Sequence, residues 1–243
     1  MYGGGFAAGS RDPFPGLVYD NIGAFFAQRG ILTAIADYRL APESTYPTPV
    51  EDIRNAIRFT LTSPHVDVTG SGGDVNQVYL LGHSAGGAHV ATLFLNDDIL
   101  TNQDRALLKG AIIMGAMYGS APHLTMYYGE PAEDIDKKCP LGLLNSKSTD
   151  KVSYLSPTSR LASKHLDQLI RLLPHKLFLL KSEKDDPVFL QWDQMFQNAL
   201  HEKGITDYHT HTMKGHNHIS PEVSLFSGEG EEWGEEVVRW IKA

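Results

Sequence analysis

Apolar residues are arranged along the chain in two alternating patterns. Short apolar runs bounded by turn residues are typical of buried strands. They predict strands over residues 31–40, 77–82, 108–117, 175–183 and 207–215. Apolar residues that recur about every three or four positions are typical of amphipathic helices. They predict helices over residues 18–30, 48–63, 85–95, 189–204 and 231–243.

Strands that alternate with helices predict a mostly parallel sheet with helices on both faces, which is the α/β class. The length of 243 residues suits one large domain, and we expect residues 1–243 to form it. The alternation breaks over residues 118–164, where Gly, Pro, Ser and Tyr are frequent and the periodicity is weak. We expect this interval to be a small cap or insertion over a site, and the alternative is a solvated loop.

Composition narrows the classes of partner and compartment. The formal net charge is -8 at pH 7, so we expect neither nucleic acid nor an anionic membrane as a partner. Cys139 is the only cysteine, so folding does not depend on an oxidising compartment. We find no signal peptide and no apolar run long enough to span a membrane. We therefore expect a cytoplasmic protein; the sequence does not indicate its oligomeric state.

One serine lies between glycines where a strand is predicted to become a helix. Gly82, Ser84 and Gly86 form the pattern Gly-x-Ser-x-Gly, which is typical of a nucleophile elbow in this context. In so tight a turn, side chains two before and two after the serine would collide, so both positions favour glycine. The following helix offers the free N–H of Ala85 to a developing oxyanion. The pattern predicts Ser84 as a nucleophile, and the alternative is an inert turn.

A serine nucleophile needs a base, and the base needs an acid to orient it. In α/β-hydrolases these follow in the order serine, acid, histidine. Asp185 and Asp186 follow the strand predicted over residues 175–183, at the sheet edge where ligands bind in open α/β sheets. We prefer Asp185 as the orienting acid, and Asp186 is the alternative.

The base is predicted in the loop before the last helix. His216 and His218 both lie there, and we prefer His218, which apolar Ile219 follows. Together with His209 and His211 they suggest a metal cluster as an alternative. No carboxylate or cysteine completes such a cluster nearby, so we expect no metal, and no motif indicates a cofactor.

Two further stretches complete the predicted site. The run Gly3-Gly4-Gly5 precedes Phe6, and its backbone could closely approach a substrate carbonyl as the second half of an oxyanion hole. The alternative is a flexible chain start. Four residues in or beside the insertion are candidates to line a substrate pocket, with ordinary packing as the alternative. They are Met117, Tyr118, Tyr127 and Tyr128.

These motifs together resemble the α/β-hydrolase superfamily, specifically the esterase/lipase branch related to hormone-sensitive lipase and the neighbouring kynurenine formamidase-like esterases. "YGGGF" resembles the His-Gly-Gly-Gly loop of that branch, with Tyr2 in the place of the histidine. "DYRLAPE" resembles its Tyr-Arg-Leu-Ala-Pro-Glu segment, and "GHSAGGAHVA" resembles the elbow of the formamidase-like relatives. "NHIS" resembles the formamidase-type ending, which favours His218.

The resemblance implies an α/β-hydrolase fold and roles for several residues. Gly4, Gly5 and Ala85 would form the oxyanion hole, and Arg39 would pair with an acid such as Glu51 or Asp52. Members of this branch have further strands before the glycine loop. None precedes it in this chain, so we expect a truncated form that lacks those N-terminal strands.

Three functions follow as hypotheses. The first is a serine esterase that cleaves small carboxylic esters through an acyl-enzyme. The second is hydrolysis of an N-formyl or other activated amide, as the formamidase resemblance implies. The third is a non-catalytic member that binds a ligand, like the plant gibberellin receptors. Those receptors lack the triad histidine, whereas this chain has a candidate for every role.

Overall fold

A computed structural model describes residues 1–119 and 156–243. Its four strands form one parallel sheet in which the spatial order equals the chain order. The strands are β1 (Val78–His83), β2 (Leu108–Met114), β3 (Lys176–Ser182) and β4 (His209–Met213). Because all four run in the same direction, their carboxyl ends meet at one edge of the sheet.

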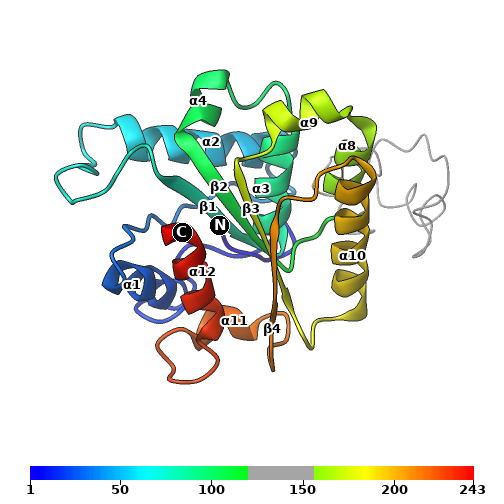
Figure 1. Cartoon of the computed structure of the whole chain (residues 1–243). Helices are drawn as coiled ribbons and strands as arrows, with labels where there is room; N and C mark the ends of the chain where they lie inside the picture. Colours follow the sequence, from blue (N-terminus) through cyan, green and yellow to red (C-terminus); the bar gives the residue numbers. More distant parts are fainter. Residues whose placement is uncertain (120–155) are drawn as a thin grey trace.

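Helices cover both faces of this sheet (Figure 1). The helices on one face are α2 (Thr48–Thr62), α3 (Ala85–Leu95), α8 (Pro157–Ser163), α9 (Leu166–Leu172) and α10 (Pro187–Glu202). Those on the other face are α1 (Asp20–Gln28) and α12 (Glu232–Lys242). The short helix α4 (Asn102–Leu107) leads into β2. Another short helix, α11 (Ser220–Ser224), follows His218. No helix in the two described ranges is both long and apolar enough to cross a membrane.

The strands divide their side chains between two hydrophobic cores. In β3, Leu177 and Leu179 pack with α3 and α10, whereas Phe178 and Leu180 pack with α1 and α12. Successive side chains of a strand point to opposite faces, so a continuous apolar run fills both cores. The α/β class predicted from the sequence is therefore confirmed.

The predicted elements are found with one exception. The strands predicted from residue 77 onward are present with slightly different bounds, as are the predicted helices. The strand predicted over residues 31–40 is wrong, because this segment forms no strand. Residues 31–36 and residues 78–81 of β1 both line a cavity of about 1540 Å³. Paired strands lie about 5 Å apart, and none of the described strands pairs with residues 31–40.

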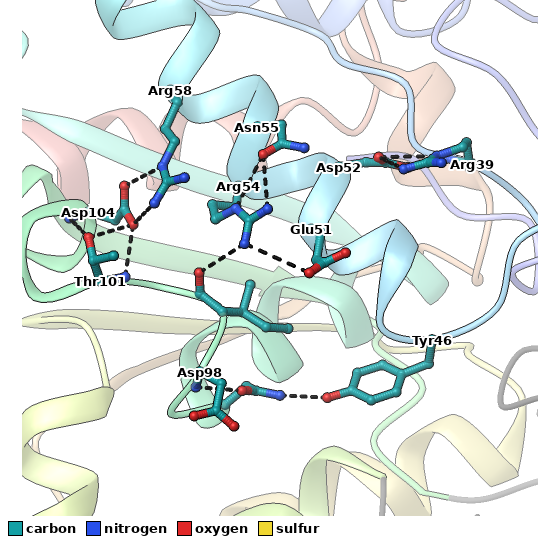
Figure 2. Close-up of polar contacts among 12 residues, drawn as sticks. Arg39, Tyr46, Glu51, Asp52, Arg54, Asn55, Arg58, Asp98, Thr101 and Asp104 are labelled. Atoms are coloured by element: carbon teal, nitrogen blue, oxygen red, sulfur yellow. Dashed lines mark hydrogen bonds and ion pairs between the residues drawn. The ribbon is translucent and has the colours of Figure 1, made fainter.

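Paired charges connect α2 to its surroundings (Figure 2). Arg39 binds both carboxylate oxygens of Asp52 in α2, at 2.7 and 3.0 Å, as the resemblance implied. Arg58 of α2 binds both oxygens of Asp104 in α4, at 2.9 and 2.7 Å. Hydrogen bonds from Arg58 are the main reason that the pKa of Asp104 is lowered to about 2. These pairs fix α2 and the end of the irregular segment 31–40.

Most of the predicted insertion, residues 120–155, lies outside the described residues. Of the remainder, α8 packs against α3 and α10 on one face of the sheet. The cap over the site thus stays a prediction.

Candidate active site

The turn between β1 and α3 holds Ser84 in an unusual backbone conformation. Its φ is 53° and its ψ is -119°, a strained combination for a residue with a side chain. The Ser84 N–H donates to the Met114 carbonyl at the end of β2, at 2.9 Å, and the Ser84 carbonyl accepts from the Met117 N–H at 3.3 Å. The last residue of β2 and the segment that follows it therefore bind both backbone groups of Ser84.

Two close approaches explain the glycines on either side of Ser84. A Cβ added to Gly82 would lie 2.5 Å from the carbonyl oxygen of Gly86, as the expected collision across the turn requires. A Cβ added to Gly86 would instead lie 2.3 Å from the carbonyl oxygen of Tyr2. At Gly86 the nearest atoms belong to Met1 and Tyr2, so the backbone of the first residues, which crosses the start of α3, is a further reason for glycine there.

Three side chains distant in sequence meet at the carboxyl edge of the sheet. Ser84 Oγ lies 2.9 Å from His218 Nε2, and His218 Nδ1 lies 2.9 Å from Asp185 Oδ1. The Asp185 side chain is 1% exposed and that of His218 is 20% exposed. Asp185 Oδ1 also accepts from the Asp186 N–H at 2.8 Å. A buried carboxylate, an imidazole and a hydroxyl thus form one hydrogen-bonded series.

The two alternative residues make other contacts. Asp186 caps α10, since its carboxylate accepts from the Val188 N–H at 3.1 Å. The His216 ring lies 2.9 Å from Ser220 Oγ through Nδ1 and 2.9 Å from the Gly230 carbonyl through Nε2. Both are held in structural hydrogen bonds, and neither has a described contact with Ser84.

The glycine loop lies against the serine. A Cβ added to Gly3 would be 2.9 Å from Ser84 Cβ, and one added to Gly4 would be 2.1 Å from the carbonyl oxygen of Ala8. Gly4 and Gly5 both have positive φ, at 119° and 60°. Gly3, which the predicted glycine run includes but which was not assigned to the oxyanion hole, is thus the position whose missing side chain lets the loop approach Ser84 this closely.

Ala85 is the first residue of α3. Its N–H has no acceptor within the helix, as for every residue of a first helical turn. The dipole of α3 adds positive potential at this end. A negatively charged oxygen bonded to Ser84 would therefore meet a donor and a favourable field here.

Two aromatic rings contact the imidazole of His218. The centroid of the Phe189 ring lies 3.9 Å from that of His218, and the centroid of the His83 ring lies 4.8 Å away. Phe189 comes from α10, and no sequence signal distinguished it from other apolar residues of that helix. His83 lies within the Gly-x-Ser-x-Gly motif, directly before Ser84.

The candidate pocket residues are only partly described. Met117 and Tyr118 are buried, and the Tyr118 ring stacks on Phe196 of α10 with centroids 4.2 Å apart. These contacts favour packing over substrate binding. Tyr127 and Tyr128 lie outside the described residues. No group of three or more His, Cys, Asp or Glu side chains in residues 1–119 and 156–243 is arranged to hold a metal ion.

Comparisons with known proteins are consistent with this geometry. A family model described as alpha/beta hydrolase fold matches residues 1–218. A kynurenine formamidase of Salmo salar is 25% identical over 172 residues, which are 71% of this chain and 50% of that protein. A probable isoprenylcysteine alpha-carbonyl methylesterase of Oryza sativa subsp. japonica is 27% identical over 189 residues, 75% of this chain and 43% of that protein. The chain spans about half the length of these curated relatives.

Solved structures share the architecture at lower identity. The esterase of the archaeon Pyrobaculum calidifontis superposes with a TM-score of 0.66 at 20% identity, covering 99% of this chain and 74% of that one. Carboxyl esterase 2 of Tuber melanosporum gives a TM-score of 0.65 at 18% identity, covering 100% of this chain and 76% of that one. At these identities the likeness shows a shared fold.

Proposed function

Because the chain belongs to the α/β-hydrolase fold family, we propose that it is a serine hydrolase of carboxylesterase type. It cleaves small carboxylic esters through an acyl-enzyme. The observation that carries the proposal is the series Ser84–His218–Asp185, with both hydrogen bonds at 2.9 Å. No cofactor takes part in the proposed reaction. The composition favours a cytoplasmic setting, which stays a prediction.

The proposed reaction begins with a proton transfer. His218 Nε2 takes the proton of Ser84 Oγ as this oxygen attacks the ester carbonyl carbon. The imidazolium then gives the proton to the leaving alcohol, and the acyl group stays on Ser84. A water molecule, deprotonated by the same nitrogen, attacks the acyl-enzyme. The bond between the acyl carbon and Ser84 Oγ then breaks, Oγ takes the proton back from the imidazolium, and the acid is released. Asp185 holds the Nδ1–H and stabilises the imidazolium while it exists.

The oxyanion formed in each step needs hydrogen-bond donors. We assign this role to the backbone N–H of Ala85, together with those of Gly4 and Gly5. The closeness of the glycine loop to Ser84 supports the assignment, since a Cβ at Gly3 would touch Ser84 Cβ. Such donors are fixed before the reaction, so they stabilise the transition state without reorganisation.

A second candidate is hydrolysis of an N-formyl arylamide, an arylformamidase reaction. The observation that favours it is the 25% identity with a protein named kynurenine formamidase, over 71% of this chain. The same three side chains would serve, with an arylamine as the leaving group. If neither substrate reacts, we infer instead that the chain is a non-catalytic member of the fold that binds a ligand.

Hydrolysis of p-nitrophenyl esters from acetate to octanoate tests the proposal, beside an N-formyl arylamide. We expect ester turnover that Ser84→Ala abolishes, with a chain-length profile that measures the acyl pocket. Faster turnover of the formyl amide would favour the second candidate. If the folded, monodisperse protein hydrolyses neither substrate, the hydrolase proposal is wrong for this chain.

A further inference from the structure

A second histidine lies beside the proposed catalytic histidine and contacts its backbone. His83 is the last residue of β1, and its ring is nearly fully buried. His83 Nε2 lies 2.8 Å from the carbonyl oxygen of His218. The ring of His83 thus supports the backbone of the residue whose side chain faces Ser84.

The other side of the His83 ring faces a buried carboxylate. His83 Nδ1 lies 2.6 Å from Glu222 Oε1, and their side chains are 3% and 8% exposed. Glu222 belongs to α11, four residues after His218. The two contacts of His83 therefore join the carbonyl of His218 to the helix that follows it. The ring of His83 thus connects both ends of the segment from His218 to Glu222.

Glu222 is itself held by the start of α1. Its carboxylate accepts from the Tyr19 hydroxyl at 3.2 Å, and its backbone carbonyl accepts from Asn21 Nδ2 at 2.9 Å. Tyr19 and Asn21 lie at the start of α1. The position of His218 is thereby tied to β1 through His83 and to α1 through Glu222.

The direction of one of these contacts is fixed by chemistry. A carbonyl oxygen can only accept, so Nε2 of His83 is the donor in its 2.8 Å contact with the His218 carbonyl. Burial alone would raise the pKa of Glu222, but its contacts with His83 and Tyr19 hold that pKa below its usual range. A buried carboxylate thus lies against the ring that donates to the backbone of His218.

We propose that His83 and Glu222 form a positioning pair that holds His218 at hydrogen-bonding distance from Ser84 and Asp185. The inference rests on the proposed serine mechanism. Neither residue is assigned a proton transfer in this proposal. His83 acts through its contacts with the backbone and the ring of His218, and Glu222 acts through His83. Since displacement of a catalytic group by about 1 Å can cost about 100-fold in rate, losing the pair should lower kcat and leave KM unchanged.

The test is a double-mutant cycle of His83→Gln and Glu222→Gln. We expect each single variant to lose about 10- to 100-fold in kcat with KM within about twofold, because substrate contacts remain. The double variant should lose about as much as one single variant, since the two residues act as one unit. The NMR signal of the proton between His218 Nδ1 and Asp185 should broaden or shift in both single variants.

A matched control uses an exposed histidine–glutamate pair. His209 Nε2 lies 3.1 Å from Glu236 Oε1, with side chains 43% and 21% exposed, and neither has a described contact with His218. The same cycle on His209→Gln and Glu236→Gln should leave kcat unchanged. If Glu222→Gln fails to fold, Tyr19→Phe removes one hydrogen bond to Glu222 and should lower kcat about two- to fivefold.

The outcomes separate the inference from the proposed function. If Ser84→Ala retains activity, the serine mechanism fails and the pair has nothing to position. If Ser84→Ala is inactive while Glu222→Gln keeps full kcat, the positioning inference alone is overturned. A rise in KM at constant kcat, or additive losses in the cycle, would also overturn it.

Discussion

Two histidine–carboxylate pairs in this protein have nearly the same length and very different surroundings. His218 and Asp185 lie 2.9 Å apart with the carboxylate 1% exposed, whereas His209 and Glu236 lie 3.1 Å apart with the histidine 43% exposed. The first pair has a third member, since His218 Nε2 lies 2.9 Å from Ser84 Oγ. In the second pair, the His209 ring packs against the ring of Phe178.

The comparison teaches that distance alone does not make a reactive pair. Burial removes competing water from the Asp185 carboxylate, so its charge acts on the imidazole in a low-dielectric setting. In the proposed mechanism, the Ser84 hydroxyl is the third partner and supplies the proton that the oriented imidazole accepts. His209 on β4 and Glu236 on α12 are in partial contact with solvent, where an ion pair contributes little.

The largest effect should come from removing the partners of the first pair. Ser84→Ala and His218→Ala should each lower kcat about 10⁵-fold or more, because nucleophile and base act as a unit. His209→Ala should leave kcat unchanged. Ester hydrolysis by each variant, corrected for folded protein by circular dichroism, measures this. Comparable losses in His209→Ala would remove the distinction between the pairs.

The carboxylates give the next largest effect. Asp185→Asn should lower kcat about 10⁴-fold, since the amide no longer stabilises the imidazolium or the required tautomer. Glu236→Gln is the matched change in the exposed pair and should have no effect on kcat. The measurement is the same ester assay under saturating substrate. An Asp185→Asn variant with full activity would show that another group orients His218.

A third histidine isolates the effect of burial on stability. Burial is the main cause that lowers the pKa of His89 in α3 to about 3, from an unfolded value of about 6.5. Between about pH 3 and about pH 6.5, His89 therefore binds a proton in the unfolded chain but not in the folded chain. The contribution of neutral His89 to the free energy of unfolding is complete above about pH 6.5. It falls on acidification, by up to about 1.4 kcal/mol per pH unit. Urea unfolding from pH 7 to 5 should show a shallower slope in His89→Gln than in the unchanged protein. Equal slopes would contradict the prediction.

The smallest effect should come from the residue next to Asp185. Asp186→Ala removes the cap of α10 and should cost about 1 kcal/mol of unfolding free energy, with kcat unchanged. Thermal unfolding and the ester assay on the same sample separate the two. A loss of kcat as large as that of Asp185→Asn would exchange the roles of the two aspartates.

The three side chains that the sequence analysis selected lie within hydrogen-bonding distance of one another, and their catalytic roles stay predictions. Ser84, Asp185 and His218 follow from local patterns: a glycine-bounded turn, an acid after a strand and a histidine in a late loop. The choice of His218 over His216 depended on a resemblance, because both lie in the same loop. Their different contacts, to Ser84 in one case and to Ser220 and Gly230 in the other, arise only from the folded arrangement.

Two features could not be predicted because they depend on neighbours distant in sequence. Residues 31–40 have the composition of a strand, but a strand also requires a partner at pairing distance, and none of the described strands pairs with this segment. Glu222 has no local signal, because its role depends on meeting His83 from the other end of the chain. Local propensity thus predicted the elements, and tertiary contacts determined how they are used.

The most direct test of the central claim is covalent labelling of Ser84. The protein is incubated with a fluorophosphonate, which reacts with activated serines, and its intact mass and peptides are measured. The account predicts one adduct, on Ser84, absent in Ser84→Ala, strongly slowed in His218→Ala and unchanged in His209→Ala. No adduct on the folded protein, or equal labelling of Ser84→Ala, would contradict it.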